Sequence, residues 1–132
     1  MSQENLETTQ KFVDTFNREG VEATAPFIAE DLQVHPFPEW PGPPFYCGLE
    51  GFTKLVEEWT ENFDDYAWRV ERLIEAGERV VILARHSGRT KDQGVSVDEA
   101  VGGVFWLSGA RVVRMDYFLR WDEALEAVGL RE

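Results

Sequence analysis

Proline is concentrated in one short segment, which constrains the fold of this chain more than any other feature. Five of the six prolines lie between His35 and Tyr46. Each proline fixes its own φ, lacks a backbone N–H and favours an extended conformation in the residue before it. The segment therefore predicts a stiff loop that is neither a helix nor a central strand. Because exposed aromatic surface costs roughly 25 cal/mol per Å², we expect Trp40, Phe45 and Tyr46 to fold over an apolar pocket and form its rim.

Length and charge limit the classes of protein to which the chain can belong. Its 132 residues, 43% of them hydrophobic, suit one domain spanning 1–132. The formal net charge is −12, and residues 1–66 hold three basic and fourteen acidic side chains. Such a chain repels phosphate backbones and anionic membrane surfaces. We therefore expect neither nucleic acid nor a membrane as a partner.

The N-terminal residues and the cysteine content predict a cytoplasmic protein. The first residues lack a basic stretch followed by an apolar one, and no apolar run approaches the roughly 18 residues that span a bilayer. The single cysteine, Cys47, has no intramolecular disulfide partner and is expected to be a small buried hydrophobe.

Apolar residues in the first half recur with the period of a helix. The apolar positions between Leu6 and Phe16 form one helix face, and Gly20 should end that helix. A short second helix should follow over residues 23–28. The strongest pattern recurs at i, i+3, i+4, i+7 and i+11 over residues 52–63, which predicts a helix with one apolar stripe.

The second half changes to the period of a strand. Four strands are predicted, over residues 66–74, 79–87, 95–107 and 111–119, with a tight hairpin turn at Gly109. A short helix should follow, with Asp122 as its N-cap. Successive hairpins imply a mostly antiparallel sheet, and helices followed by strands predict an α+β domain with its helices gathered on one face.

The strand at 79–87 is apolar on both of its faces. Val81 and Leu83 lie on one face, and Val80, Ile82 and Ala84 on the other. Both faces should therefore be covered. Since the domain has few helices, we expect a homodimer through the sheet, with Trp106 and Phe118 as anchors; the alternative is a monomer with a half-exposed sheet.

The order of elements and three segments resemble those of known families. The segments are Asn17–Gly20 (NREG), Ala29–Leu32 (AEDL) and Val112–Leu119 (VVRMDYFL). The chain resembles the SnoaL-like and ketosteroid-isomerase-like families of the nuclear transport factor 2 superfamily. The resemblance implies a cone-shaped α+β fold, whose curved sheet wraps around the N-terminal helices and an internal apolar cavity. It also implies frequent homodimers.

The catalytic positions of these families are mostly replaced here. By resemblance, the oxyanion-donating tyrosine of ketosteroid isomerases falls at Phe12, its general-base aspartate at or beside His35, and its protonated aspartate near Gly103. The histidine and acid of SnoaL-like cyclases fall at Met115 and Tyr117. These replacements argue against either reaction by the family's own residues.

Limonene epoxide hydrolases, on the same fold, use an Asp-Arg-Asp set. Arg85 and Asp116 are the only loose matches to that set. A complete set is therefore missing for this reaction as well.

Three residues are candidate catalytic groups. His35 can take or give a proton near neutral pH, Tyr117 can donate a hydrogen bond to a developing oxyanion, and Arg85 can bind an anion, with Glu99 as its possible partner. Each could instead hold the structure together, by bonding loop carbonyls, packing or forming an ion pair. Asp116 would replace Tyr117 in the cavity only if a bulge shifted the register.

A set of mainly apolar side chains could form the ligand site. Its predicted members are Phe12, Phe16, Trp40, Tyr46, Trp59, Glu99, Phe105 and Met115. The interpretation requires Trp40 and Trp59 to approach each other. The sequence has no glycine-rich phosphate loop, no serine elbow and no metal-ligand spacing, so no cofactor or metal is expected.

Three functions remain open from the sequence. The first is a cofactor-independent enzyme that performs proton transfer, isomerisation, cyclisation or hydrolysis on a small hydrophobic carbonyl or epoxide compound. The second is a non-catalytic module that binds such a molecule. The third is a dimerisation module, which the single-domain length and the aromatic rim disfavour.

Overall fold

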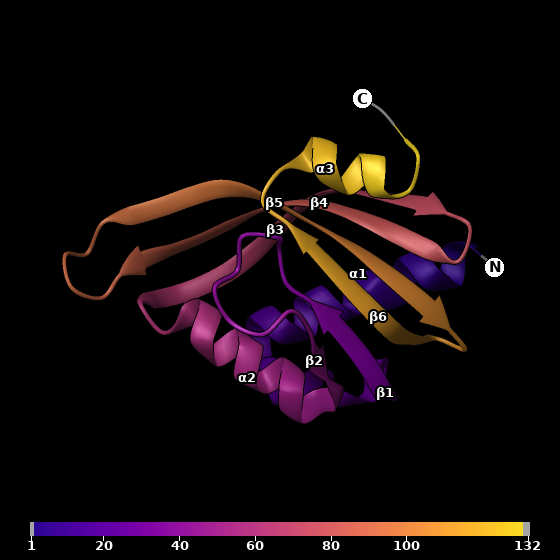
Figure 1. The fold of residues 1–132 in the computed structure, drawn as a ribbon, viewed down its shortest axis with the longest axis horizontal. Coiled ribbons are helices and arrows are strands. Elements are labelled where there is room, and N and C mark those ends of the chain that lie inside the picture. The colour runs from indigo at the N-terminus through magenta and orange to yellow at the C-terminus, as the bar shows by residue number, and fades with distance from the viewer. Residues whose placement is uncertain (1, 131–132) are drawn as a thin grey trace.

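The computed structural model describes residues 2–130 and contains helices on both faces of one sheet (Figure 1). The elements in chain order are α1 (Ser2–Glu19), the 3₁₀ helix η1 (Val21–Phe27), β1 (Ile28–His35), β2 (Tyr46–Cys47), α2 (Gly48–Thr60), β3 (Phe63–Ala76), β4 (Arg79–Thr90), β5 (Ser96–Ser108), β6 (Arg111–Phe118) and α3 (Trp121–Ala127). No helix within the described part of the chain is both long and apolar enough to cross a membrane.

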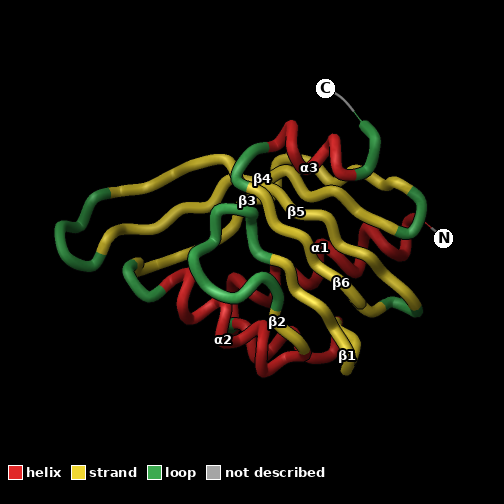
Figure 2. Tube along the Cα trace, in the orientation of Figure 1, coloured by secondary structure: helices red, strands yellow, loops and turns green. Residues whose placement is uncertain are grey.

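The six strands form one sheet in the order β2-β1-β6-β5-β4-β3. β1 and β6 run parallel, and the other neighbouring pairs run antiparallel. Figure 2 shows the curvature of this sheet, with the β4–β5 hairpin extending beyond the rest of it. The predicted α+β class with a curved, mostly antiparallel sheet is confirmed.

Residues with positive φ end α1 and turn the last hairpin. Gly20, with φ of 97°, follows the last residue of α1, as the sequence predicts. Gly109 and Ala110 have φ values of 59° and 62°, the backbone of a tight turn whose twist matches the strands. This turn aligns β5 with β6 so that Gly103 lies opposite Tyr117.

Two apolar cores lie on opposite faces of the sheet. On the inner face, which faces α1 and α2, β4 contributes Val80, Ile82 and Ala84. On the outer face, Val81 and Leu83 pack against α3. The prediction that all helices share one face is therefore wrong, because α3 crosses to the outer face and covers part of the apolar surface there (Figure 1).

Several predicted element boundaries are also wrong. Ile28 begins β1 rather than ending a helix, and Phe63 begins β3 rather than ending α2. β4 continues to Thr90, beyond the predicted end of its strand. Cys47 is exposed rather than buried, because it lies on the two-residue edge strand β2.

The proline segment forms a loop over residues 36–45 that packs on α2. The Trp40 and Trp59 rings stack with centroids 6.0 Å apart, so the two tryptophans do approach each other. The Trp40 indole N–H donates to the Tyr46 hydroxyl at 3.0 Å, and that hydroxyl donates to Glu58 at 2.8 Å. The loop is therefore attached to α2 by side chains rather than by a backbone ladder.

Candidate functional site

A pocket lies between the two long helices and the inner face of the sheet. The cavity volume is about 40 Å³, which is room for about three water molecules. Together with the open solvent in front of it, the empty space between the side chains is about 500 Å³. The lining residues come from α1 (Phe12, Val13, Phe16), α2 (Phe52, Leu55, Val56, Trp59, Thr60), β3 (Tyr66, Trp68), β5 (Phe105) and β6 (Tyr117).

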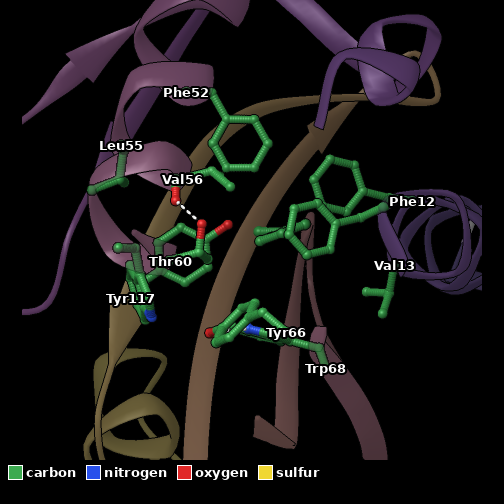
Figure 3. A pocket seen from close by; sticks show the side chains of 12 residues that line it. Phe12, Val13, Phe52, Leu55, Val56, Thr60, Tyr66, Trp68 and Tyr117 are labelled. Atoms are coloured by element: carbon green, nitrogen blue, oxygen red, sulfur yellow. Dashed lines mark hydrogen bonds between the residues drawn. The ribbon is translucent and has the colours of Figure 1, made fainter. Parts of the chain in front are cut away.

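The wall of this aromatic pocket is built mainly from rings in edge contact, with Phe12 and Phe52 tilted by 33° against each other. Phe12 meets Phe105 at 5.2 Å in a T-shaped pair and Phe52 at 5.9 Å. Figure 3 shows Phe52 from α2 and Phe12 from α1 turned toward each other. Trp59 and Trp68 each meet the Tyr117 ring edge-on, at 5.6 and 5.7 Å. Edge contacts of this kind fix ring positions and leave a dry surface for a flat apolar molecule.

Tyr117 contributes a buried hydroxyl with a weak partner. The side chain is 7% exposed, and its hydroxyl donates to the Met115 sulfur at 3.2 Å. A thioether sulfur is a weak acceptor, so a stronger acceptor in the pocket would compete for this proton. Burial, and secondarily the nearby Tyr66, raises the pKa of Tyr117 far above its ordinary value, which keeps the hydroxyl a neutral donor.

Tyr66 and His86 form a second polar group beside the pocket. The Tyr66 oxygen lies 2.8 Å from His86 Nδ1 and accepts a hydrogen bond from the Trp68 indole N–H at 3.0 Å. The phenol proton can then occupy the bond to Nδ1, which assigns the neutral imidazole proton to Nε2. Burial raises the pKa of Tyr66, and the indole N–H groups of Trp68 and Trp59 offset part of that rise.

Burial also lowers the pKa of His86, which is 8% exposed. Glu99 and Asp98 act in the opposite direction and raise it, whereas Arg85 lowers it further. The net shift favours a neutral imidazole at pH 7, which is able to accept a proton.

Two of the three predicted catalytic residues do not face the pocket. His35 lies on the outer face, since the adjacent Val34 fills the inner core, and its ring stacks on Phe45 at 5.9 Å. Burial lowers the pKa of His35; Arg114 lowers it further, and Asp116 partly offsets this. The interpretation of His35 as a base in the pocket is therefore wrong in its geometry.

Arg85 is also on the outer face. Its Nε donates to Asp98 at 2.6 Å, so Asp98, and not Glu99, is its partner. Its neighbours Ala84 and His86 point inward, whereas anion binding in the cavity would require Arg85 to point inward. Since Arg85 and Asp98 are 35% and 50% exposed, the pair is a surface ion pair.

Four of the eight predicted ligand-site residues line the pocket: Phe12, Phe16, Trp59 and Phe105. Trp40 stacks behind Trp59, and Tyr46 is bonded to Glu58, so the proline loop supports one wall without forming a rim. Met115 lies behind Tyr117.

Glu99 and Asp116 lie outside the pocket lining. Glu99 is exposed and lies opposite His86 on β4. Asp116 is on the outer face, where it accepts from the Trp106 indole at 3.1 Å and pairs with Arg114. The predicted register is thus retained, with Tyr117 inward and Asp116 outward.

The sequence interpretation missed Tyr66, Trp68 and His86. The alternation of Tyr66, Trp68 and Val70 is the signal that places the first two on one strand face. His86 could not be placed in the same way, because β4 is apolar on both faces and alternation does not say which face is inner. Pairing with β3 settles the question, since Trp68 lies directly opposite His86.

The comparison with family models identifies the family of this chain. A family model for the SnoaL-like domain matches residues 9–115, and the chain belongs to that family. A comparison with curated proteins returned no match.

Solved structures with low sequence identity share the fold. A proposed SnoaL-like polyketide cyclase from Jannaschia sp. CCS1 is 18% identical, with a TM-score of 0.78 over 99% of this chain and 95% of that one. A nuclear transport factor 2-like protein of unknown function from Burkholderia pseudomallei K96243 is 16% identical, with a TM-score of 0.77 over 96% and 98%. TerC, co-crystallised with polyporic acid, is 16% identical, with a TM-score of 0.77 over 95% and 97%. At these identities the likeness extends to the fold alone.

Proposed function

We propose that the aromatic pocket binds a small cyclic molecule that carries a carbonyl or hydroxyl oxygen. The observation that carries this proposal is the Tyr117 hydroxyl, a buried donor in an apolar pocket whose own acceptor is a thioether. An oxygen acceptor on the ligand would give this donor a stronger bond, while the rings around it would bury the rest of the molecule.

The size of the pocket limits the ligand. A cavity of about 150 Å³ holds benzene, whereas the volume of this pocket is about 40 Å³. A single ring must therefore lie partly in the open mouth or displace a lining side chain.

The proposal has a catalytic and a non-catalytic form. In the first, the protein catalyses cofactor-independent proton transfer, isomerisation, cyclisation or hydrolysis on the bound molecule. The description of one structural neighbour as a proposed polyketide cyclase, and the co-crystallisation of another with polyporic acid, support a cyclic oxygen-bearing ligand. In the second form, the same pocket binds without chemistry.

Tyr117→Phe should weaken binding of a cyclic ketone or phenol by about 3- to 10-fold, the value of one hydrogen bond. The probes are cyclopentanone and phenol, titrated against the protein by calorimetry. The melting temperature should change little, because the variant removes only the hydrogen bond from Tyr117 to the Met115 sulfur, which is a weak acceptor. Phe16→Trp, which fills the pocket from a half-buried position, is the control and should abolish binding. Undiminished affinity in Tyr117→Phe, or no saturable binding by either probe, would contradict the proposal.

We also propose that the outer face of the sheet joins two copies of the chain. Trp106 lies there between Arg79 and Arg114, 5.2 and 5.6 Å from its ring, and donates to Asp116. The arginines and Asp116 therefore place opposite charges around an aromatic anchor. In a dimer with two-fold symmetry, the positive groups of one copy can face the negative groups of the other. Sedimentation equilibrium should give twice the chain mass of 15.2 kDa. A single-chain mass at micromolar concentration would contradict the dimer.

We propose a cytoplasmic location on the basis of the cysteine. Cys47 is exposed and free. An exposed free thiol is typical of a reducing compartment, where it stays reduced.

A further inference from the structure

We propose that Thr60 determines which ligand the aromatic pocket selects, so that the pocket binds a neutral cyclic alcohol or phenol in preference to a cyclic ketone. This inference rests on the proposed function, because it requires a cyclic molecule to occupy the pocket with its oxygen at Tyr117. It narrows the ligand from either kind of oxygen to a hydroxyl group, which both accepts and donates a hydrogen bond.

Three hydroxyl groups line the pocket, on Thr60, Tyr66 and Tyr117. Apart from two tryptophans, whose indole N–H can only donate, the other described lining side chains are hydrocarbons. Any side chain that accepts a hydrogen bond from a ligand in this pocket must therefore be one of these three hydroxyl groups.

The hydroxyl of Tyr66 is already used by its neighbours. Its oxygen lies 2.8 Å from His86 Nδ1 and accepts a hydrogen bond from the Trp68 indole N–H at 3.0 Å. Burial raises the pKa of this phenol, and the indole N–H groups of Trp68 and Trp59 both act on it in the opposite direction. With its proton on His86 and two indole N–H groups acting on its oxygen, Tyr66 has no strong bond left for a ligand.

The hydroxyl of Thr60 has its proton fixed and its lone pairs free. Its Oγ1 donates to the Val56 carbonyl at 2.8 Å, one turn earlier on α2, and Figure 3 shows this bond as a dashed line. A threonine hydroxyl has one proton and two lone pairs. Since the helix carbonyl takes the proton, the group that Thr60 presents to a ligand is an acceptor.

The hydroxyl of Tyr117 has the opposite role. Its proton is held only by the Met115 sulfur, and burial keeps the group protonated, so a ligand oxygen can recruit it as a donor. The pocket thus combines one donor from β6 with one acceptor from α2. A ring hydroxyl can use both, because its oxygen accepts from Tyr117 and its proton goes to Thr60, whereas a ring carbonyl can use only the donor.

The ligand hydroxyl must also be neutral. None of the described residues that line the pocket carries a charge. A phenolate or carboxylate would therefore lose its hydration without gaining a positive partner, which is unfavourable in an apolar site. A neutral hydroxyl loses only the hydrogen bonds that Thr60 and Tyr117 can replace.

The test is calorimetric titration with cyclopentanol and cyclopentanone, which share one ring and differ in the oxygen group. The wild-type protein should bind cyclopentanol about 3- to 10-fold more tightly, the value of one additional hydrogen bond. Thr60→Val has nearly the shape of threonine but no hydroxyl, so it should remove this preference while leaving the affinity for cyclopentanone unchanged. Thr60→Ser retains the hydroxyl and should retain the preference.

The matched control is Thr53→Val, a half-buried threonine of the same helix outside the pocket lining, which should leave both affinities unchanged. The comparison of the two probes on the wild-type protein needs no variant, so it tests the inference even if Thr60→Val fails to fold. Equal affinities, or tighter binding of the ketone, would overturn the inference and leave the proposed function intact. A preference that persists in folded Thr60→Val would also overturn it. Absence of saturable binding by both probes and by phenol would overturn both proposals.

Discussion

Phe105→Ala should lower the free energy of unfolding by about 3–5 kcal/mol, the usual cost of truncating a buried phenylalanine. Phe105 is 1% exposed and lies between Phe12, at 5.2 Å, and Tyr117, at 6.2 Å. Its ring thus connects α1 to the sheet at the back of the pocket. Neither neighbour can fill the vacated space without leaving its own contacts, so most of the cavity should remain.

Urea denaturation followed by circular dichroism measures this loss. Phe45→Ala is the matched control, because Phe45 is 50% exposed and should change stability by less than about 0.5 kcal/mol. A loss below about 1.5 kcal/mol in Phe105→Ala would mean that the pocket collapses freely, which contradicts a wall of mutually fixed rings.

Trp59→Ala should both open the pocket and release the proline loop. Trp59 contacts Phe37 at 5.3 Å and Trp40 at 6.0 Å on one side, and Tyr117 at 5.6 Å on the other. Because the side chain is only partly buried, the expected loss of unfolding free energy is about 2–4 kcal/mol. Binding of cyclopentanone should fall below detection, since one pocket wall is removed.

Release of the loop is measured separately by hydrogen exchange. The Trp40 amide donates to the Phe37 carbonyl at 2.9 Å, and its exchange should accelerate at least about 10-fold in Trp59→Ala. Trp40→Ala is the comparison variant: it should loosen the loop while retaining the pocket wall and most of the ligand affinity. Equal loss of affinity in the two variants would show that the loop itself forms part of the site.

Much of the fold follows from local patterns in the sequence. The apolar stripe of α2 from Phe52 to Trp59, and the alternation within each strand, each involve several residues. One residue that departs from such a pattern therefore does not obscure it. The turn at Gly109 has a backbone requirement that few residues satisfy. Errors concentrate at boundaries such as Phe63, where an apolar residue suits the end of a helix and the start of a strand equally.

The candidate site was less predictable, and Arg85 and His86 show why. They are adjacent on a strand that is apolar on both faces, so one residue of parity decides which of them meets the pocket. A catalytic role for Arg85 in the pocket requires that the adjacent His86 point away from it, whereas the structure has the reverse. The placement of His35 beside the pocket was wrong for a related reason. A segment rich in prolines predicts a stiff loop, but it does not predict toward which face of the sheet the neighbouring side chains point.

The amino-acid sequence alone determined the α+β class, the family, the stiff loop at residues 36–45 and the inward register of Tyr117, because each depends on residues close together in the chain. Tertiary structure alone decided which face of β4 is inner, that α3 covers the outer face, and that Tyr66, Trp68 and His86 meet beside one pocket. These three features depend on strand pairing and helix packing between segments that are distant in the chain. The periodicity of apolar residues within one segment does not show which distant segment it packs against.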